Sequence, residues 1–551
     1  MDDKELRVFS LRSAMIFLYI VVVAVIPLAL RARIVSFTSP VETWRRLEST
    51  TITEVFAQFR LELLVIATVL IVITALLKYY YEDEKDKFAS SYADYPLLVF
   101  AALVLLSGLL SPYINLAFWG FYNRGEGAFA YLSYIFIFVV AANFINAEKD
   151  KKIIFYAALA AGLLQSLLAV TQFFGFDVLK SELAMRLFVP SEYLPYVEDI
   201  EFMFRNKGAG ATINPNYMGG YMAMIFPMIF VRYLYSRTAR ETVIWMVVLI
   251  IGLTGFFAPT SMAAFIAGGI AIIFFLVISI KDAGRYYKKL IATIVILIVI
   301  TGISEPLSGG AIGRKISGFY RNSFELIRES MDEGVTVRRD FSGDVAAGES
   351  EGKEIVIYRN PLDTFASNRG YIWRKSLNMM KDNLFIGSGL DTFVYNFPHW
   401  DPHRDHSVYR IGLLIDKPHN TYIQIATGVG VLGLFVYLFV LGRHFFYYLR
   451  IYRLRGVKEE SDLIMLALFV GWVGYLIQGL SNDSVLSNAP VFWALFGISV
   501  NYVKNAMIIE KDVIRKEPGG KINLDERLKP PPEEKTKGQK GGRGTKKKKK
   551  K

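Results

Sequence analysis

The sequence predicts an all-α polytopic membrane protein with about twelve transmembrane helices and one large extracytoplasmic loop between spans nine and ten. The chain has 551 residues and is 53% hydrophobic, whereas soluble domains are usually ~45–50% apolar. It also carries about a dozen apolar runs that approach the ~20 residues a helix needs to cross a bilayer. Together these features exclude a soluble enzyme, a disordered chain and a β-barrel.

Each predicted span is an apolar run bounded by polar or charged residues. The runs at 290–303 and 490–503 are short for a span, so we expect their helices to extend into flanking apolar residues. The predicted spans cover residues 13–30, 61–80, 95–110, 128–145, 153–174, 217–234, 242–258, 262–280, 290–303, 421–441, 463–480 and 490–503.

Positive charge predicts the orientation of these spans, because Lys and Arg accumulate in cytoplasmic loops. If the N-terminus is cytoplasmic, the inner segments hold 19 Lys and Arg in 70 residues, against 10 in 101 residues for the short outer segments. We therefore expect both termini in the cytoplasm. Arg31, Arg33, Arg45 and Arg46 lie in the first outer segment and oppose this bias.

The predicted organisation has four parts. Spans one to nine occupy residues 1–303, the large extracytoplasmic loop occupies 304–420, and spans ten to twelve occupy 421–503. The loop is nearly neutral, with 15 Lys and Arg against 16 Asp and Glu. Within it, the stretch SNRGYIWRKSLNMMKDN has the pattern of an amphipathic helix opened by Ser367 or Asn368.

Residues 504–551 are predicted to form a disordered, basic cytoplasmic tail. This segment holds 17 Lys and Arg and 7 Asp and Glu, so it carries most of the chain's net charge of +13. It could bind anionic lipid of the inner leaflet, or it could be a solvated orientation signal. Because the positive charge is concentrated in this tail, the charge does not indicate nucleic-acid binding.

His419 is the candidate catalytic residue. It lies in the stretch DKPHNTY, where the loop enters span ten. The unperturbed pKa of histidine, ~6.5, suits a general base near neutral pH. Asn420 or Thr421 could cap the helix that follows. The alternative interpretation is that His419 itself is a capping or interfacial residue.

Two arginines are candidate phosphate contacts. Arg369 begins the stretch RGYIWRKS in the large loop, and Arg124 lies in FYNRGEG between spans three and four. A planar guanidinium can pair with two phosphate oxygens, which suits a lipid pyrophosphate at the outer interface. Either arginine alone could instead extend toward lipid headgroups.

Further polar residues lie at the predicted outer face. Asn214 and Asn216 precede or begin span six, and Asn482 and Asp483 lie between spans eleven and twelve. The stretch PHWDPHRDH offers possible zinc ligands, but its spacing matches no known pattern and we expect no metal. The chain has no cysteine, which excludes disulfides and thiolate ligands.

Five of these segments, in this order, resemble the bacterial O-antigen ligase and polysaccharide polymerase superfamily, which includes protein O-oligosaccharyltransferases. FYNRGEGAFAYLSY is similar to its early Arg-x-x-Gly segment, and INPNYMGGYMAM to its Asn-Pro-Asn segment. SNRGYIWRKSLNMMKDNLFIGSGLDTF is similar to its Arg-x-x-x-Trp helix and Gly-x-Gly turn. KPHNTYIQIATGVGVLGLFVYL is similar to its His-Asn segment, and GLSNDSVLSNAPVFWALFG to the version found in Gram-positive members.

The resemblance implies a membrane glycosyltransferase with a GT-C-like helical fold that needs no cofactor or metal. The implied donor is an undecaprenyl-pyrophosphate-linked glycan, and the implied acceptor is a glycan, lipid or protein hydroxyl. It implies His419 as the base and Arg369 as a diphosphate contact, with direct displacement and inversion at the anomeric carbon. Arg124, Asn420, Asn216 and Asn214 lie in the matching segments and are the further expected substrate contacts.

Two departures from the family pattern affect this expectation. Many members have an arginine in a Ser-Arg-Gly motif, and Met262 stands in the matching place here. Thr427 and Gly428 replace an acidic residue that often follows the His-Asn segment. The sequence alone leaves open an alternative function, a twelve-helix transporter or flippase of lipid-linked glycans.

Overall fold

The structure is a computed structural model, and it describes most of the helical part of the chain. The described residues are 3–36, 51–82, 90–194, 207–307, 310, 313–314, 317–318, 321, 336–338, 356–358, 363, 365–399 and 414–516.

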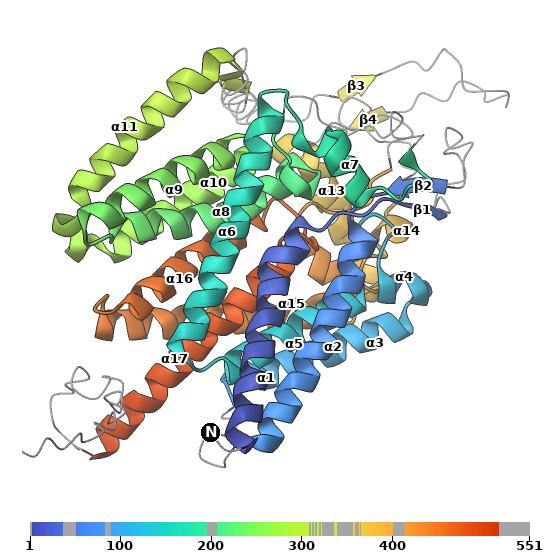
Figure 1. The fold of residues 1–551 in the computed structure, drawn as a ribbon. Helices are drawn as coiled ribbons and strands as arrows, with labels where there is room; N and C mark the ends of the chain where they lie inside the picture. The colour runs from blue at the N-terminus through green and yellow to red at the C-terminus, as the bar shows by residue number, and fades with distance from the viewer. Residues whose placement is uncertain are drawn as a thin grey trace, which may run out of the picture.

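Helices cover all or nearly all of each of the twelve predicted spans (Figure 1). In chain order they are α1 (Asp3–Ile20, continued by η1, Val21–Val25, and η2, Ile26–Leu28), α2 (Ala57–Tyr81), α3 (Asp94–Leu110), α5 (Ala128–Phe144), α6 (Glu148–Phe173), α8 (Pro215–Leu234), α9 (Ala239–Phe257), α10 (Met262–Ile278), α11 (Ala283–Leu307), α15 (Thr421–Arg455), α16 (Glu460–Gln478) and α17 (Ala489–Lys516).

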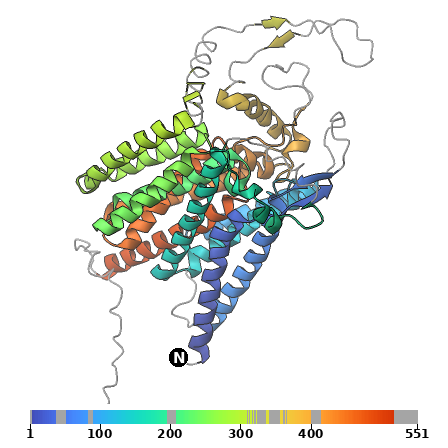
Figure 2. The same cartoon turned by 45° about the horizontal axis from the view of Figure 1, so that its top comes forward.

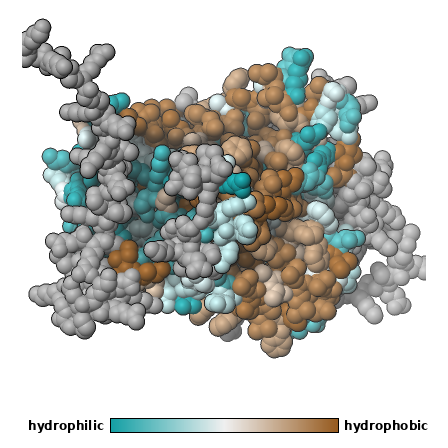
Figure 3. Space-filling model, turned by 60° about the horizontal axis from the view of Figure 1, so that its bottom comes forward, coloured by the Kyte–Doolittle hydropathy of each residue, from teal (hydrophilic) through white to brown (hydrophobic). Residues whose placement is uncertain are grey.

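Eight of the described helical segments are long and apolar enough to cross a membrane. Three shorter apolar helices, α3, α5 and α10, accompany them. Apolar side chains also cover broad areas of the outer surface (Figure 3), as expected where lipid takes the place of water. The chain is therefore a polytopic helical membrane protein, and the count of twelve spans stays a prediction.

Short elements join these helices. The mostly helical structure agrees with the predicted all-α class, and the described residues add two small antiparallel hairpins: β1 (Arg33–Ser36) pairs with β2 (Thr51–Glu54), and β3 (Thr336–Arg338) pairs with β4 (Val356–Tyr358). The other short elements are α4 (Ile114–Trp119), η4 (Val178–Lys180), α7 (Glu182–Phe188), η6 (Gly210–Thr212), η7 (Ile280–Asp282), α13 (Phe365–Met379), η9 (Met380–Asn383) and α14 (Phe393–Asn396).

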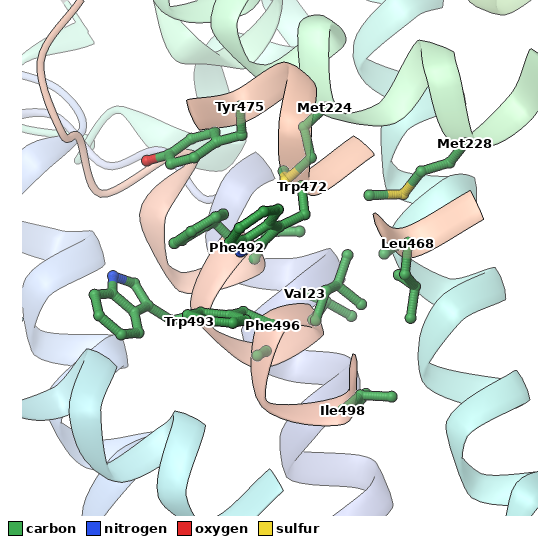
Figure 4. Packing of buried hydrophobic residues seen from close by; sticks show 14 of the residues in the cluster. Val23, Met224, Met228, Leu468, Trp472, Tyr475, Phe492, Trp493, Phe496 and Ile498 are labelled. Carbon is green, nitrogen blue, oxygen red and sulfur yellow. The ribbon is translucent and has the colours of Figure 1, made fainter. Parts of the chain in front are cut away.

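The helices α8, α16 and α17 form the centre of the bundle. Met224 and Met228 of α8 pack against Trp472 of α16 and Phe496 of α17 (Figure 4). Glycine allows α8 and α16 to approach closely, because a Cβ atom at Gly474 would lie 2.1 Å from the carbonyl oxygen of Ala223. Small residues at helix crossings serve the same purpose in other membrane proteins. By contrast, α11 lies at the edge of the bundle with little of its surface buried.

The large loop returns to the bundle by inserting into a break in α15. Gly430 has φ 81° and ψ 175°, which interrupts the helix. The backbone of the loop fills this break: Ser388 N donates to Thr427 O at 3.0 Å, and Val431 N donates to Leu384 O at 2.8 Å. A Cβ atom at residue 430 would lie 2.1 Å from a loop carbonyl oxygen, so the insertion requires glycine there.

The amphipathic helix predicted in the large loop is present as α13. It begins at Phe365, two residues before the predicted cap, and Asn368 has a left-handed φ of 70°, a conformation that Asn tolerates better than most residues. Figure 2 shows α13 at the opposite end of the bundle from the N-terminus.

The predicted tail boundary at residue 504 needs correction. The helix α17 continues to Lys516, and Glu510 of this extension forms an ion pair with Arg450 of α15 at 2.8 Å. The stretch NAMIIEKDVIRK consists largely of good helix formers, which explains why the helix does not end at Val503. The rest of the predicted tail, residues 517–551, lies outside the described residues.

Candidate active site

His419 lies in the link that enters α15, as predicted. Its backbone has φ 52°, and its side chain is 31% exposed. The Nδ1 atom lies 3.0 Å from Oδ2 of Asp483, whose side chain is fully buried in the loop between α16 and α17. With the proton on Nδ1, the imidazole donates to this carboxylate and leaves Nε2 as an acceptor. That is the state a general base requires.

Asp483 is ionised at neutral pH. Burial alone would raise its pKa, but His419, Lys417 and Arg124 together hold that pKa well below its ordinary value. A buried carboxylate that stays charged fixes the orientation of the imidazole it accepts from. Asp483 is thus a positioning residue for His419. Sequence reasoning singled it out as a polar residue but did not pair it with the histidine.

The start of α15 fixes the loop that carries Asp483. Thr421 N donates to Gly479 O at 2.8 Å, and the Thr421 hydroxyl donates to Asn482 O at 2.9 Å. Asn420 caps α15, since its Oδ1 accepts from Tyr422 N and Ile423 N. Its Nδ2 donates to a third partner, the carbonyl oxygen of Leu480. The side chain of Asn420 is therefore used by the fold, which argues against the predicted substrate contact.

The helix α13 lies beside His419. The indole Nε1 of Trp373 donates to the carbonyl oxygen of Pro418 at 2.9 Å. Arg369, partly exposed, lies one helical turn before Trp373 and therefore about 6 Å from it along the helix axis. The structure thus places Arg369, the predicted diphosphate contact, on α13. This helix contacts Pro418, the residue before the predicted base His419.

Arg124 is placed differently from its prediction. Its guanidinium is buried, forms an ion pair with Asp391 at 2.7 Å, and donates to the carbonyl oxygen of Asp416 at 3.0 Å. Oδ2 of Asp391 also accepts from Phe121 N and Glu126 N. These contacts tie the segment before α5 to the large loop. We therefore assign Arg124 a role in holding the loop rather than in binding a donor.

Asn214 and Asn216 lie at the start of α8. Asn214 caps this helix by accepting from Asn216 N at 2.9 Å. The side chain of Asn216 is exposed; its Oδ1 accepts from the Ser261 hydroxyl, while Asn482 donates to its backbone oxygen. Asn216 therefore lies at the rim of the same cluster as Asp483, whereas Asn214 serves the fold. Met262 directly follows Ser261, at the start of α10.

A family match covers the part of the chain that carries Arg369 and His419. Residues 247–438 match the model of the O-Antigen ligase family. The match supports membership of the O-antigen ligase and polymerase superfamily. The matched segment runs from α9 into α15 and contains both Arg369 and His419. No curated protein matches the chain.

Residues outside the matched segment also lie at or near the candidate site. Asp483 belongs to the loop before α17, and Glu126 is fully buried in the segment before α5. Sequence reasoning missed Glu126 and Asp391 as structural partners, although both lie in segments quoted for the family resemblance. Nε2 of His399 donates to the carbonyl oxygen of Val394, and the other two histidines of PHWDPHRDH lie outside the described residues.

Glu126 gives a pH-dependent prediction for stability. Burial raises its pKa from 4.5 to about 7, although the Tyr134 hydroxyl donates to its Oε1 and opposes this change. Because the folded state favours the protonated form, stability should fall as the pH rises from about 4.5 to about 7, by up to roughly 1.4 kcal/mol for each pH unit. Glu126→Gln should remove this dependence. Melting temperatures of both purified proteins across this range test it, and parallel curves would contradict it.

Proposed function

We propose that the protein transfers a glycan from an undecaprenyl-pyrophosphate carrier to an acceptor hydroxyl at the outer face of the cell membrane. The O-antigen ligase family match supports the general kind of activity, glycan transfer by a membrane ligase or polymerase. The observation that carries the finer proposal is the contact between Trp373 and Pro418. It joins the helix that carries Arg369 to the backbone of Pro418, the residue before His419.

The acceptor end of the reaction is assigned to His419. A hydroxyl is a poor nucleophile, and a neutral imidazole that takes its proton helps it to attack. Asp483 holds Nδ1, so Nε2 is the atom that receives the proton. The acceptor oxygen then bonds to the anomeric carbon as the bond from that carbon to the pyrophosphate oxygen breaks. Such a direct displacement inverts the anomeric configuration, and no step of it is assigned to a metal.

The donor end is assigned to Arg369. Negative charge grows on the pyrophosphate as it leaves, and fixed positive charge at that point lowers the barrier. A guanidinium can hold two phosphate oxygens at once. Arg369 lies one turn from Trp373 on this helix, and we propose that its guanidinium and the imidazole of His419 meet opposite ends of one sugar residue.

We place this site outside the cytoplasm. The distribution of Lys and Arg favours cytoplasmic termini. In the structure, α1 begins and α17 ends at the same end of the bundle, opposite α13 (Figures 1 and 2). This supports the same side of the membrane for both termini. The proposed acceptor is a glycan, lipid or protein hydroxyl. The tail beyond α17 is proposed to meet anionic lipid of the inner leaflet.

Purified protein should form a new glycosidic bond when it is incubated with a defined lipid-pyrophosphate glycan and candidate acceptors. Mass spectrometry of the products measures this. Arg369→Ala should reduce transfer at least tenfold, because a hydrogen bond to a charged group is worth about 1.5–3 kcal/mol. Lys381→Ala, which removes an exposed cation near the end of the same helical segment, is the matched control and should keep the wild-type rate.

Two outcomes would contradict the proposal. Transport of the lipid-linked glycan across liposomes without any new bond would favour the transporter interpretation. Equal loss of transfer in Arg369→Ala and Lys381→Ala would show that Arg369 acts only through the general positive charge of this surface.

A further inference from the structure

Lys417 lies two residues before His419, and its charged side chain is largely buried at the site. Its side chain is only 13% exposed. Its ammonium donates to the hydroxyl of Tyr217 at 2.5 Å and lies 5.1 Å from the centre of that ring. Burial favours the neutral amine, yet the pKa of Lys417 is raised because Asp416, Tyr217 and Asp483 favour the charged form. Lys417 is therefore a cation throughout the physiological pH range.

Among the described residues, one hydrogen-bond acceptor is found for the three N–H donors of this ammonium. An ammonium has three N–H donors, and the hydroxyl of Tyr217 accepts one of them. Among the described residues, the closest carboxylate oxygen paired with it is Oδ2 of Asp416, which lies 3.6 Å away, beyond hydrogen-bond distance. Arg124 differs in this respect, because it is held in a close ion pair with Asp391. Lys417 can thus bind an anion without losing its contact with Tyr217.

The surroundings of Lys417 also favour an anion. Tyr217 belongs to the first turn of α8, and the neighbouring Asn216 accepts from Ser261 at the start of α10. Lys417 itself precedes the start of α15. The N-terminus of a helix carries partial positive charge, so the start of α8 adds to the field of the ammonium that contacts Tyr217. The lysine side chain supplies the full charge and the hydrogen bonds.

We propose that Lys417 binds the diphosphate of the prenyl-linked donor, next to the sugar that His419 and its acceptor attack. This inference rests on the proposed function and names a residue that binds its leaving group. When the bond between the anomeric carbon and the pyrophosphate oxygen breaks, its electron pair passes to that oxygen. The proton of the acceptor passes to Nε2 of His419. Lys417 stabilises the charge gained by the diphosphate and gives up no proton.

Binding of a sugar-free probe tests this assignment separately from catalysis. The probe is farnesyl pyrophosphate, with farnesol as the neutral comparison, titrated into the purified full-length protein in detergent. Lys417→Met should raise the dissociation constant for farnesyl pyrophosphate about 10- to 100-fold. It should leave the farnesol affinity unchanged. Lys417→Arg should recover most of the lost affinity, and Lys381→Ala should behave as the wild type.

Unmodified protein provides a second readout that does not depend on a variant that folds. Farnesyl pyrophosphate should raise the melting temperature of the unmodified protein, because a ligand that binds only the folded state stabilises it. Farnesol at the same concentration should raise it less. An unchanged dissociation constant in a folded Lys417→Met protein, or equal stabilisation of the wild type by farnesyl pyrophosphate and farnesol, would overturn the assignment. Failure of the wild type to transfer glycan would instead overturn the proposed function, whatever the binding result.

Discussion

Replacing His419 with alanine is expected to lower the turnover of glycan transfer by about 100- to 10,000-fold, the usual contribution of a general base. The donor should still bind, because the cations that we assign to its diphosphate remain in place. The protein should also remain folded, since Asn420 and Thr421 hold the start of α15 independently of the imidazole. Turnover numbers at saturating donor and acceptor, together with the donor affinity, test this prediction.

Two further variants sharpen the result. His399→Ala removes a partly buried histidine of the same loop that lies outside the site, and it should transfer glycan at the wild-type rate. Asp483→Asn removes the charge that orients His419 and should lower turnover while leaving donor affinity unchanged. If His419→Ala keeps near-normal turnover, the imidazole is not the base, and the roles assigned to both His419 and Asp483 fail together.

Breaking the ion pair between Arg124 and Asp391 is expected to destabilise the fold strongly. Both side chains are almost fully buried, and the charged atoms lie 2.7 Å apart. Removing one partner leaves a buried charge without its counterion, which typically costs about 3–5 kcal/mol. Arg124→Ala and Asp391→Ala should therefore each lower the melting temperature of the purified protein. The double variant Arg124→Met with Asp391→Leu should recover part of the loss.

This experiment also decides between two roles for Arg124. A structural residue gives a loss of stability that the double variant reverses in part, with donor affinity following the folded fraction. A donor contact, as predicted from the sequence, would give a stable Arg124→Ala protein that binds the donor weakly. That second result would contradict the role assigned from the structure.

The sequence predicted the helices well because apolar runs of this length have few alternatives in a bilayer. It did not predict where α17 ends, since helix-forming residues continue beyond the apolar run. The hairpin of β1 and β2 was also missed, because strands of four residues carry little periodic signal. The break at Gly430 depends on loop residues 384–389, and local patterns contain no information about such a distant partner.

The same distinction applies to the site. His419 and Arg369 could be proposed from the sequence alone. Histidine suits a general base and arginine suits a phosphate contact, and neither argument requires knowledge of the neighbouring residues in the fold. The partners of these segments could not be proposed. Asp483 is 64 residues from His419, and the pairing of Arg124 with Asp391 joins the segment before α5 to the loop before α14. The first pairing requires the loop that follows α16 to lie against the start of α15, and the second requires the large loop to lie against the segment before α5.

The most direct test of the account is whether residues 369 and 419 face one crevice on the outer side of the membrane. The chain has no cysteine, so Arg369→Cys and His419→Cys can be introduced together without background reactivity. In sealed vesicles of known orientation, we expect both cysteines to react with a membrane-impermeant maleimide from the outer side, and a short bismaleimide to join them. Labelling from opposite sides, or labelling of both without any cross-link, would contradict the account.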